Sequence, residues 1–147
     1  MTRVLVLNGP NLNLLGTREP EIYGRTTLAE IEDRLRKRAA DLGLEIDCFQ
    51  SNHEGALIDR LHLGDFDWAV VNAAGLTHTS VSLRDALTGI ERPFVEVHIS
   101  DPDKREAFRR VNYLHDIAVD RIVGKGVAGY EMALEIIAAR AGHGGSL

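Results

Sequence analysis

The sequence has few of the residues that mark crosslinked, metal-binding or membrane proteins. Its single cysteine, Cys48, can form no disulfide within the chain and cannot build a thiolate metal cluster. No apolar run approaches the ~18 residues needed to span a bilayer. The N-terminal stretch carries an arginine and is interrupted by Asn8-Gly9-Pro10, so it does not resemble a secretory leader. We therefore expect a cytoplasmic protein that has no membrane partner.

An excess of basic charge is also missing. The 17 Lys and Arg residues are outnumbered by 22 Asp and Glu residues, which gives a formal net charge of −5 at pH 7. Proteins that bind nucleic acids usually concentrate basic residues on one face. Because the basic residues here are scattered along the chain, we predict no nucleic-acid partner.

The composition that remains is typical of one globular domain, with 44% hydrophobic and 27% charged residues. A chain of this length should bury roughly 70% of the surface that its unfolded form exposes. Such burial is sufficient for a stable core without crosslinks. We predict a single domain over residues 1–147, with a frayed tail at about 142–147.

Short β-branched runs alternate with helical patterns along the chain. Strands are predicted near residues 4–7, 44–49, 68–71, 94–99 and 117–123. Helices are predicted near residues 28–42, 54–63, 80–87, 104–109 and 129–141. This alternation predicts an α/β fold with a parallel sheet and helices on both faces. The commonest five-stranded solution is flavodoxin-like, with strand order 2-1-3-4-5.

Ligands bind such sheets at the carboxyl ends of the strands. Polar residues gather there, at Asn11, at 50–54, at 72–80 and at 96–100. The connection that follows the first strand is about eighteen residues long, whereas such loops usually have 2–6. We predict that residues 11–26 form a functional lid; the alternative is a solvated loop.

Glu96 and His98 should point to the same side of their strand. The carboxylate could then fix the orientation and tautomer of the imidazole. The alternative is a structural pair in the core or on the surface.

Three histidines, His53, His78 and His98, lie near strand ends, so a metal-assisted hydrolase is one alternative. Zinc sites usually contain closely spaced ligand pairs, such as H-x-x-x-H, and none occurs here. The first loop also lacks G-x-G-x-x-G and the Walker pattern. We therefore predict no metal and no cofactor.

The remaining polar side chains suit a small anionic, hydroxylated ligand, since arginine matches carboxylate geometry and amides and hydroxyls match polyols. Proton transfer is the chemistry that such a set of side chains can perform unaided. A module that binds a small carboxylate without converting it is the alternative from a different class.

Several segments resemble the type II 3-dehydroquinate dehydratases. They are L-N-G-P-N-L-N-L-L-G-T-R-E-P-E-I-Y-G at 7–24, Q-S-N-H-E-G at 50–55, T-H-T-S-V-S-L-R-D-A-L at 77–87, V-E-V-H-I-S at 95–100, R-E-A-F-R-R at 105–110 and G-V-A-G-Y at 126–130. The resemblance implies a hydro-lyase that converts 3-dehydroquinate to 3-dehydroshikimate. In this family the reaction is an anti elimination through an enolate, without metal or Schiff base.

The resemblance also implies a role for each catalytic residue. Tyr23 is the expected base, and Arg18 is the cation that stabilises its phenolate. His98 is the expected general acid, which Glu96 orients. Asn11 is expected to stabilise the enolate oxygen through a bound water.

Substrate-binding residues follow from the same resemblance. The substrate carboxylate is expected to meet Asn72, the Ser100 hydroxyl and the backbone N–H groups of Ile99 and Ser100. The substrate hydroxyls are expected to meet His78 and Arg109.

Two further residues are expected to act at the edge of the site. Arg105 should support the closed lid, and Asp85 should reach the site of a neighbouring subunit. The family assembles trimers into a tetrahedral dodecamer, so the resemblance implies a homo-oligomer.

The chain differs from common family patterns at 73–76, at Asp101, at Val111-Asn112 and at Asp120-Arg121. Asp101 adds negative charge near the expected anion site. None of the differences falls on an expected catalytic group. We interpret those at 111–112 and 120–121 as variation in packing or in subunit contacts.

Overall fold

The computed structural model describes the backbone of residues 1–145 and the side chains of residues 1–142. The strands are β1 (Arg3–Asn8), β2 (Glu45–Gln50), β3 (Trp68–Asn72), β4 (Phe94–His98) and β5 (Asp120–Val123). The α-helices are α1 (Pro20–Tyr23), α2 (Leu28–Leu42), α3 (Glu54–His62), α4 (Val81–Ile90) and α5 (Ala128–Gly145). The 3₁₀ turns are η1 (Leu12–Leu14), η2 (Ala74–His78), η3 (Pro102–Lys104), η4 (Ala107–Arg110) and η5 (His115–Ile117).

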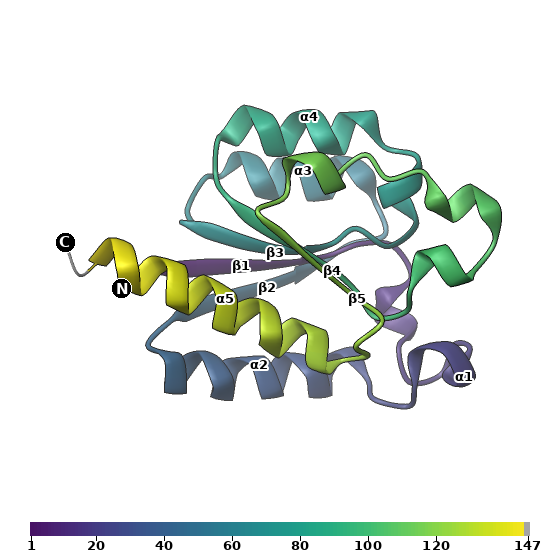
Figure 1. Cartoon of the computed structure of the whole chain (residues 1–147), viewed down its shortest axis with the longest axis horizontal. Coiled ribbons are helices and arrows are strands. Elements are labelled where there is room, and N and C mark those ends of the chain that lie inside the picture. Colours follow the sequence, from purple (N-terminus) through teal and green to yellow (C-terminus); the bar gives the residue numbers. More distant parts are fainter. Residues whose placement is uncertain (146–147) are drawn as a thin grey trace.

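The five strands form one parallel sheet in the order β2-β1-β3-β4-β5, which confirms the predicted flavodoxin-like topology. Helices α3 and α4 cover one face, and α2 and α5 cover the other (Figure 1). Val4 and Val6 of β1 pack in the core beneath α2 and α5, whereas Leu5 and Leu7 pack in the core on the opposite face. The strand is apolar throughout because both of its faces are buried.

The first long helix, α2, begins where the sequence predicts. Thr27 Oγ1 accepts a hydrogen bond from the Glu30 N–H at 3.2 Å, and Glu30 Oε1 accepts one from the Thr27 N–H at 3.1 Å. This reciprocal capping box satisfies two N–H groups that the helix itself leaves unpaired. The predicted start of α2 is confirmed, and with it the end of the preceding loop.

Two predicted elements near the site are wrong. Residues 104–109 do not form one helix, because Arg105 adopts an extended backbone conformation that separates η3 from η4. The fifth strand begins at Asp120 rather than at residue 117, because residues 115–117 form η5. The side chain of Asn112 stabilises that turn by accepting hydrogen bonds from the N–H groups of Leu114 and His115.

At the C-terminus, α5 continues to Gly145, four residues past the predicted end. The frayed tail predicted at about 142–147 is therefore helical as far as Gly145, and residues 146–147 lie outside the described residues. No helix among the described residues is long and apolar enough to cross a membrane.

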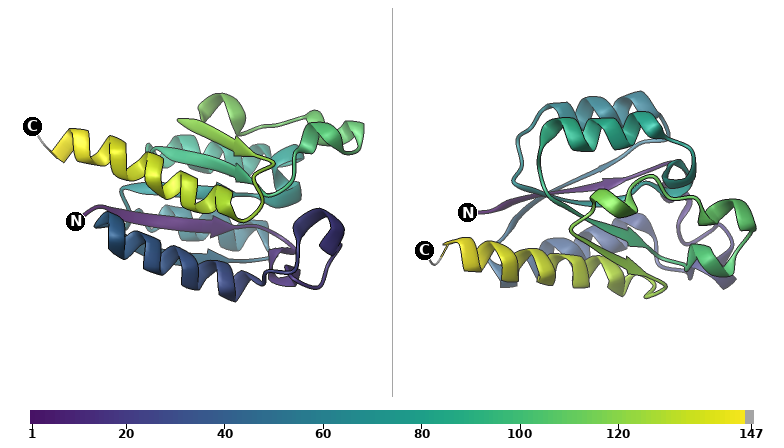
Figure 2. Two further views of the ribbon diagram at one scale, coloured as in Figure 1. Left: turned by 60° about the horizontal axis from the view of Figure 1, so that its bottom comes forward. Right: turned by 45° about the horizontal axis from the view of Figure 1, so that its top comes forward.

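The predicted lid contains two short helices, η1 and α1, and lies at the same end of the molecule as η3 and η4 (Figure 2). Gly16 closes the base of the lid with a φ of +92°, and a Cβ there would lie 2.9 Å from the Arg25 carbonyl oxygen. The positive φ and the close approach both require glycine. Gly16 therefore fixes the path of the backbone at the base of the lid.

Gly9 has a comparable role where the loops after β1 and β3 meet. Its N–H donates to the Asn72 carbonyl oxygen at 2.8 Å, and a Cβ at this position would lie 2.4 Å from the Ala73 carbonyl oxygen. The two loops approach this closely only because residue 9 has no side chain.

We expect Gly9→Ala to lower the free energy of unfolding by about 1–3 kcal/mol, since the added methyl group must displace backbone. Gly89→Ala is the matched control, because a Cβ on this residue of α4 meets nothing within 4 Å. That change should be neutral or stabilising. Urea unfolding of both variants checks the prediction, and equal stabilities would contradict it.

Candidate active site

A cavity of about 160 Å³ opens at the carboxyl ends of the strands. It is smaller than the roughly 300–1,000 Å³ of pockets for drug-sized ligands, which suits a small metabolite. Ten of the predicted site residues line it: Asn11, Arg18, Tyr23, Asn72, His78, His98, Ile99, Ser100, Arg105 and Arg109. The sequence analysis missed five further lining residues, which are Pro10, Leu12, Ala74, Gly75 and Pro102.

Two predicted site residues do not line the cavity. Glu96 lies behind His98 and is 1% exposed. Asp85 lies on α4, where it is exposed. Its expected role is in a neighbouring subunit's site.

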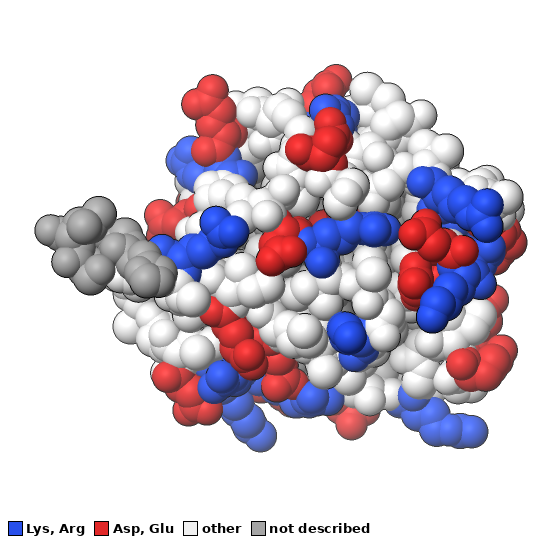
Figure 3. Space-filling model, in the orientation of Figure 1, with Lys and Arg blue, Asp and Glu red and all other residues white. Residues whose placement is uncertain are grey.

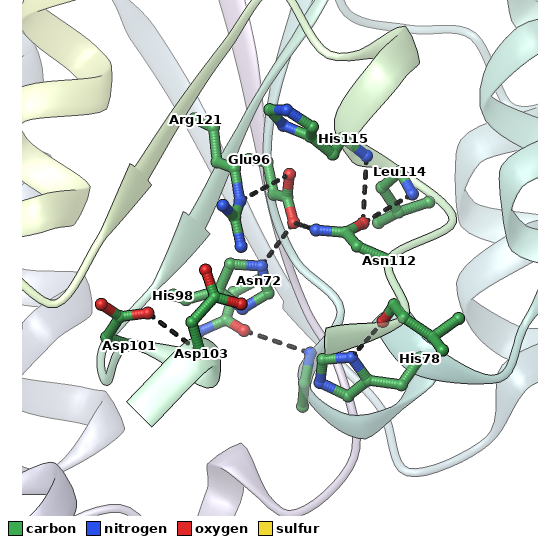
Figure 4. Close-up of polar contacts among 12 residues, drawn as sticks. Asn72, His78, Glu96, His98, Asp101, Asp103, Asn112, Leu114, His115 and Arg121 are labelled. Carbon is green, nitrogen blue, oxygen red and sulfur yellow. Dashed lines mark hydrogen bonds and ion pairs between the residues drawn. The ribbon is translucent and has the colours of Figure 1, made fainter. Parts of the chain in front are cut away.

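The His98 imidazole contacts the Glu96 carboxylate directly through Nε2 and Oε2, as shown in Figure 4. Both side chains project from the same face of β4, which confirms the prediction made from their spacing. Burial by itself would raise the pKa of Glu96, but its contacts with His98, Asn112 and Arg121 outweigh burial and hold that pKa below the usual value. Glu96 is therefore an ionised carboxylate fixed against His98.

Two residues on neighbouring segments also contact Glu96. The Asn112 amide donates to Glu96 Oε2 at 2.6 Å, and Arg121 Nε lies 3.5 Å from Glu96 Oε1. The sequence analysis assigned both residues to packing or subunit contacts and did not foresee their contacts with Glu96. The signal that could have indicated this contact is the charge of Arg121. A cation within a strand of a parallel sheet needs a partner of opposite charge.

A second buried network holds Asn72. Its amide nitrogen donates to the Tyr130 hydroxyl at 2.9 Å, and its oxygen accepts from the Ala74 N–H at 3.1 Å. The Tyr130 hydroxyl in turn donates to Asn8 Oδ1 at 2.6 Å. Because an amide nitrogen carries two hydrogens, Asn72 keeps one donor for the cavity.

Sequence reasoning missed Tyr130 and Asn8. Tyr130 is fully buried, and burial strongly raises its pKa, so its hydroxyl stays protonated and acts as a donor. A tyrosine on the buried face of the last helix needs a polar partner for its hydroxyl, which is the signal that could have indicated this network.

Tyr23 projects from the lid between two arginines. Arg105 Nη1 donates to the Tyr23 hydroxyl at 2.6 Å, whereas the Arg18 guanidinium lies over the ring, 5.1 Å from its centroid. The cation in contact with the phenol oxygen is therefore Arg105 rather than the expected Arg18. Arg18 precedes Tyr23 on the same lid and meets its ring face, while the hydroxyl is directed toward η3 and η4.

His78 has a defined tautomer. Its Nδ1 lies 2.6 Å from the Val111 carbonyl oxygen, which can only accept, so Nδ1 carries the hydrogen (Figure 4). Burial lowers the pKa of His78, and the hydrogen bond to Val111 only partly opposes this shift. At neutral pH the ring is therefore uncharged and its Nε2 is a hydrogen-bond acceptor.

The other predicted site residues are held by local contacts. Asn11 has a φ of 71° and donates its N–H to Asn52 Oδ1 at 2.9 Å, which fixes the start of the lid. Arg109 Nε donates to Glu106 at 2.8 Å. Asp101 caps η3 by accepting from the Asp103 N–H at 3.0 Å, so this oxygen is already paired and Asp101 does not line the cavity.

The three histidines of the metal-site alternative do not converge. His78 and His98 line the cavity, but His53 lies at the start of α3 and does not. Among the described residues, no group of three or more His, Cys, Asp or Glu side chains is arranged to hold a metal ion. The charged residues of both signs are interspersed on the face shown in Figure 3.

A flavodoxin-like sheet with a buried imidazole–carboxylate pair and an arginine-bound tyrosine at its carboxyl end is the arrangement of a small-molecule acid–base enzyme. The family model described as "Dehydroquinase class II" matches residues 2–138. The chain belongs to this family.

Individual relatives support the assignment. The chain is 57% identical over 134 residues to the 3-dehydroquinate dehydratase of Bordetella avium, covering 89% of this chain and 93% of that protein. It is 53% identical over 137 residues to a catabolic 3-dehydroquinase of Emericella nidulans, with 92% and 90% covered. The type II dehydroquinase structure from Propionibacterium acnes matches with a TM-score of 0.91 and 38% identity, over 95% of this chain and 97% of that one.

We expect Tyr130→Phe to lower the free energy of unfolding by about 2–4 kcal/mol, because it leaves buried polar groups of Asn8 and Asn72 without a partner. Urea unfolding measures the loss. Tyr113→Phe is the control, since it removes a hydroxyl outside this network. Equal unfolding curves for the two variants would show that the buried bonds contribute nothing.

Proposed function

We propose that this protein dehydrates 3-dehydroquinate to 3-dehydroshikimate by an anti elimination through an enolate intermediate. The observation that carries the proposal is the meeting of an arginine-bound tyrosine and a carboxylate-paired histidine at one small cavity. Elimination of water needs a base to remove the proton next to the ketone and an acid to protonate the departing hydroxyl.

Tyr23 is the base in this proposal. A free phenol is protonated at neutral pH and removes protons poorly unless a cation stabilises the phenolate. The hydrogen bond from Arg105 and the guanidinium of Arg18 over the ring supply positive charge beside the oxygen. Arg105 thereby acts on the base directly, in addition to supporting the lid.

Removal of the proton places negative charge on the substrate's carbonyl oxygen. Asn11 stabilises that charge in our proposal through a bound water. The contact between the Asn11 backbone and Asn52 supports this role, because groups that stabilise developing charge act best when held in place beforehand.

His98 then protonates the departing hydroxyl, since hydroxide is a poor leaving group. The ionised carboxylate contacts Nε2 and leaves Nδ1 for the substrate. Glu96 is buried, so it orients His98 without contacting the reacting atoms.

Substrate binding uses the remaining lining residues. Asn72, the Ser100 hydroxyl and the N–H groups of Ile99 and Ser100 bind the carboxylate, and His78 and Arg109 bind the hydroxyls. The free amide hydrogen of Asn72 and the acceptor Nε2 of His78 suit these roles.

We further propose that the enzyme is a cytoplasmic homo-oligomer, a dodecamer built from trimers, in which Asp85 completes a neighbouring site. The position of Asp85 on α4, outside its own chain's cavity, supports a role between subunits.

Replacement of Tyr23 by Phe should reduce kcat at least about 100-fold, as expected for loss of an acid–base group. The ultraviolet absorbance of the conjugated enone carboxylate in the product follows the reaction, with a chelator present throughout. Tyr113→Phe, the matched control, should retain activity. An unaffected rate in Tyr23→Phe would exclude this base.

Two results with the wild type would favour the alternatives. Saturable binding without product would favour a binding module. Loss of activity in the presence of the chelator would favour a metal-assisted enzyme.

Mixed oligomers test the role of Asp85. Asp85→Ala and Tyr23→Phe should each be inactive alone, whereas subunits that are unfolded and refolded together should regain activity. The regain is expected because some sites then combine an intact Tyr23 with an intact Asp85 from the neighbour. If mixing restores no activity while the assembly re-forms, Asp85 does not act between subunits.

A further inference from the structure

The buried carboxylate of Glu96 is held from the side away from the cavity. Glu96 and Arg121 are partners in the parallel register between β4 and β5, so their side chains lie side by side on one face of the sheet. Arg121 Nε is 3.5 Å from Glu96 Oε1, and neither atom has a hydrogen bond among the described residues. Arg121 therefore holds this oxygen through an ion pair, without a hydrogen bond between these two atoms.

Asn112 fixes the other oxygen. Its own oxygen accepts from the N–H groups of Leu114 and His115 at 2.8 and 3.0 Å, as Figure 4 shows. The amide nitrogen must therefore face Glu96, to which it donates at 2.6 Å. The donor cannot turn away without breaking the start of η5.

We propose that Arg121 and Asn112 are positioning residues that hold the Glu96 carboxylate ionised and oriented, and so set the pH range over which His98 carries the proton it donates. The proposal rests on the assignment of His98 as the acid. Neither residue lines the cavity, so both act through Glu96.

The electrostatic effect of Arg121 has a definite sign. A positive charge beside the Glu96–His98 pair disfavours an additional proton on the pair. Without Arg121, both the carboxylate and the imidazole would hold protons more strongly. Two charged or titratable groups from other elements interact with the pair, namely Arg121 on β5 and His78 on η2.

Arg121→Met tests the proposal because methionine keeps much of the length of the side chain and removes its charge. We expect the alkaline limb of the kcat profile to move to higher pH by about one unit, as for a charge removed a few ångströms away. We also expect kcat at the pH optimum to fall several-fold, with KM little changed, because Glu96 loses its fixed orientation. Arg121→Lys should restore most of the wild-type profile.

The His98 ring signals in nuclear magnetic resonance give a readout that does not depend on turnover. Their titration should move upward in Arg121→Met and return in Arg121→Lys. If the wild type proves inactive on 3-dehydroquinate, the proposed function fails, but this titration still tests the role of Arg121.

Arg3→Met is the matched control, since Arg3 also pairs with a glutamate, Glu45, at 3.0 Å and lies at the opposite end of the sheet. It should leave the kcat profile and the titration unchanged. In a Glu96→Gln background, Arg121→Met should no longer lower kcat at the pH optimum, because the carboxylate that Arg121 orients is absent. An unmoved alkaline limb and an unmoved His98 titration in folded Arg121→Met would overturn the proposal.

Discussion

One ionised carboxylate, buried in the sheet, constrains the arrangement of this site. Transfer of a charge from water into a protein interior costs several kcal/mol unless partners compensate. Glu96 is 1% exposed, and its compensation comes from His98, Asn112 and Arg121, on β4, the segment after η4, and β5. The edge strand β5 thus has a role beyond completing the sheet, since it brings a cation to a carboxylate that would otherwise be incompletely paired.

Two separate buried networks of polar contacts support the site. The bonds from Tyr130 to Asn8 and Asn72 connect α5 to the ends of β1 and β3. The Glu96 network joins β4, β5 and the segment after η4. Tyr23 belongs to neither and is attached to the rest of the site through its contact with Arg105. His98 and Asn72 are therefore held by buried contacts, whereas the position of Tyr23 depends on the loop that carries it and on Arg105.

The sequence predicted the elements that depend on local patterns. Thr27 and Glu30 defined the start of α2, and the two-residue spacing of Glu96 and His98 placed both on one face of β4. The error at 117 arose where a local signal was overlooked, because Asn112 accepts hydrogen bonds from the N–H groups two and three residues further on and so begins η5.

Long-range pairing explains the residues that were missed. Tyr130 and Asn8 are 122 positions apart, and the contact between Arg105 and Tyr23 spans 82. Which arginine meets the phenol oxygen depends on the direction of the hydroxyl in the folded lid. A pair of side chains on one strand can be predicted from its spacing in the sequence. The contacts that support the pair from other segments can be predicted only when the strand order and register are known.

The parallel register between β4 and β5 also explains why the charged side chain of Arg121 depends on the site. A charged side chain on the inner face of a sheet costs stability unless an opposite charge lies beside it. Arg121 has that partner because Glu96 occupies the adjacent position on β4. The same adjacency places the guanidinium beside the carboxylate that contacts His98. The pairing of the edge strand with β4 and the setting of the cavity histidine therefore depend on one buried carboxylate.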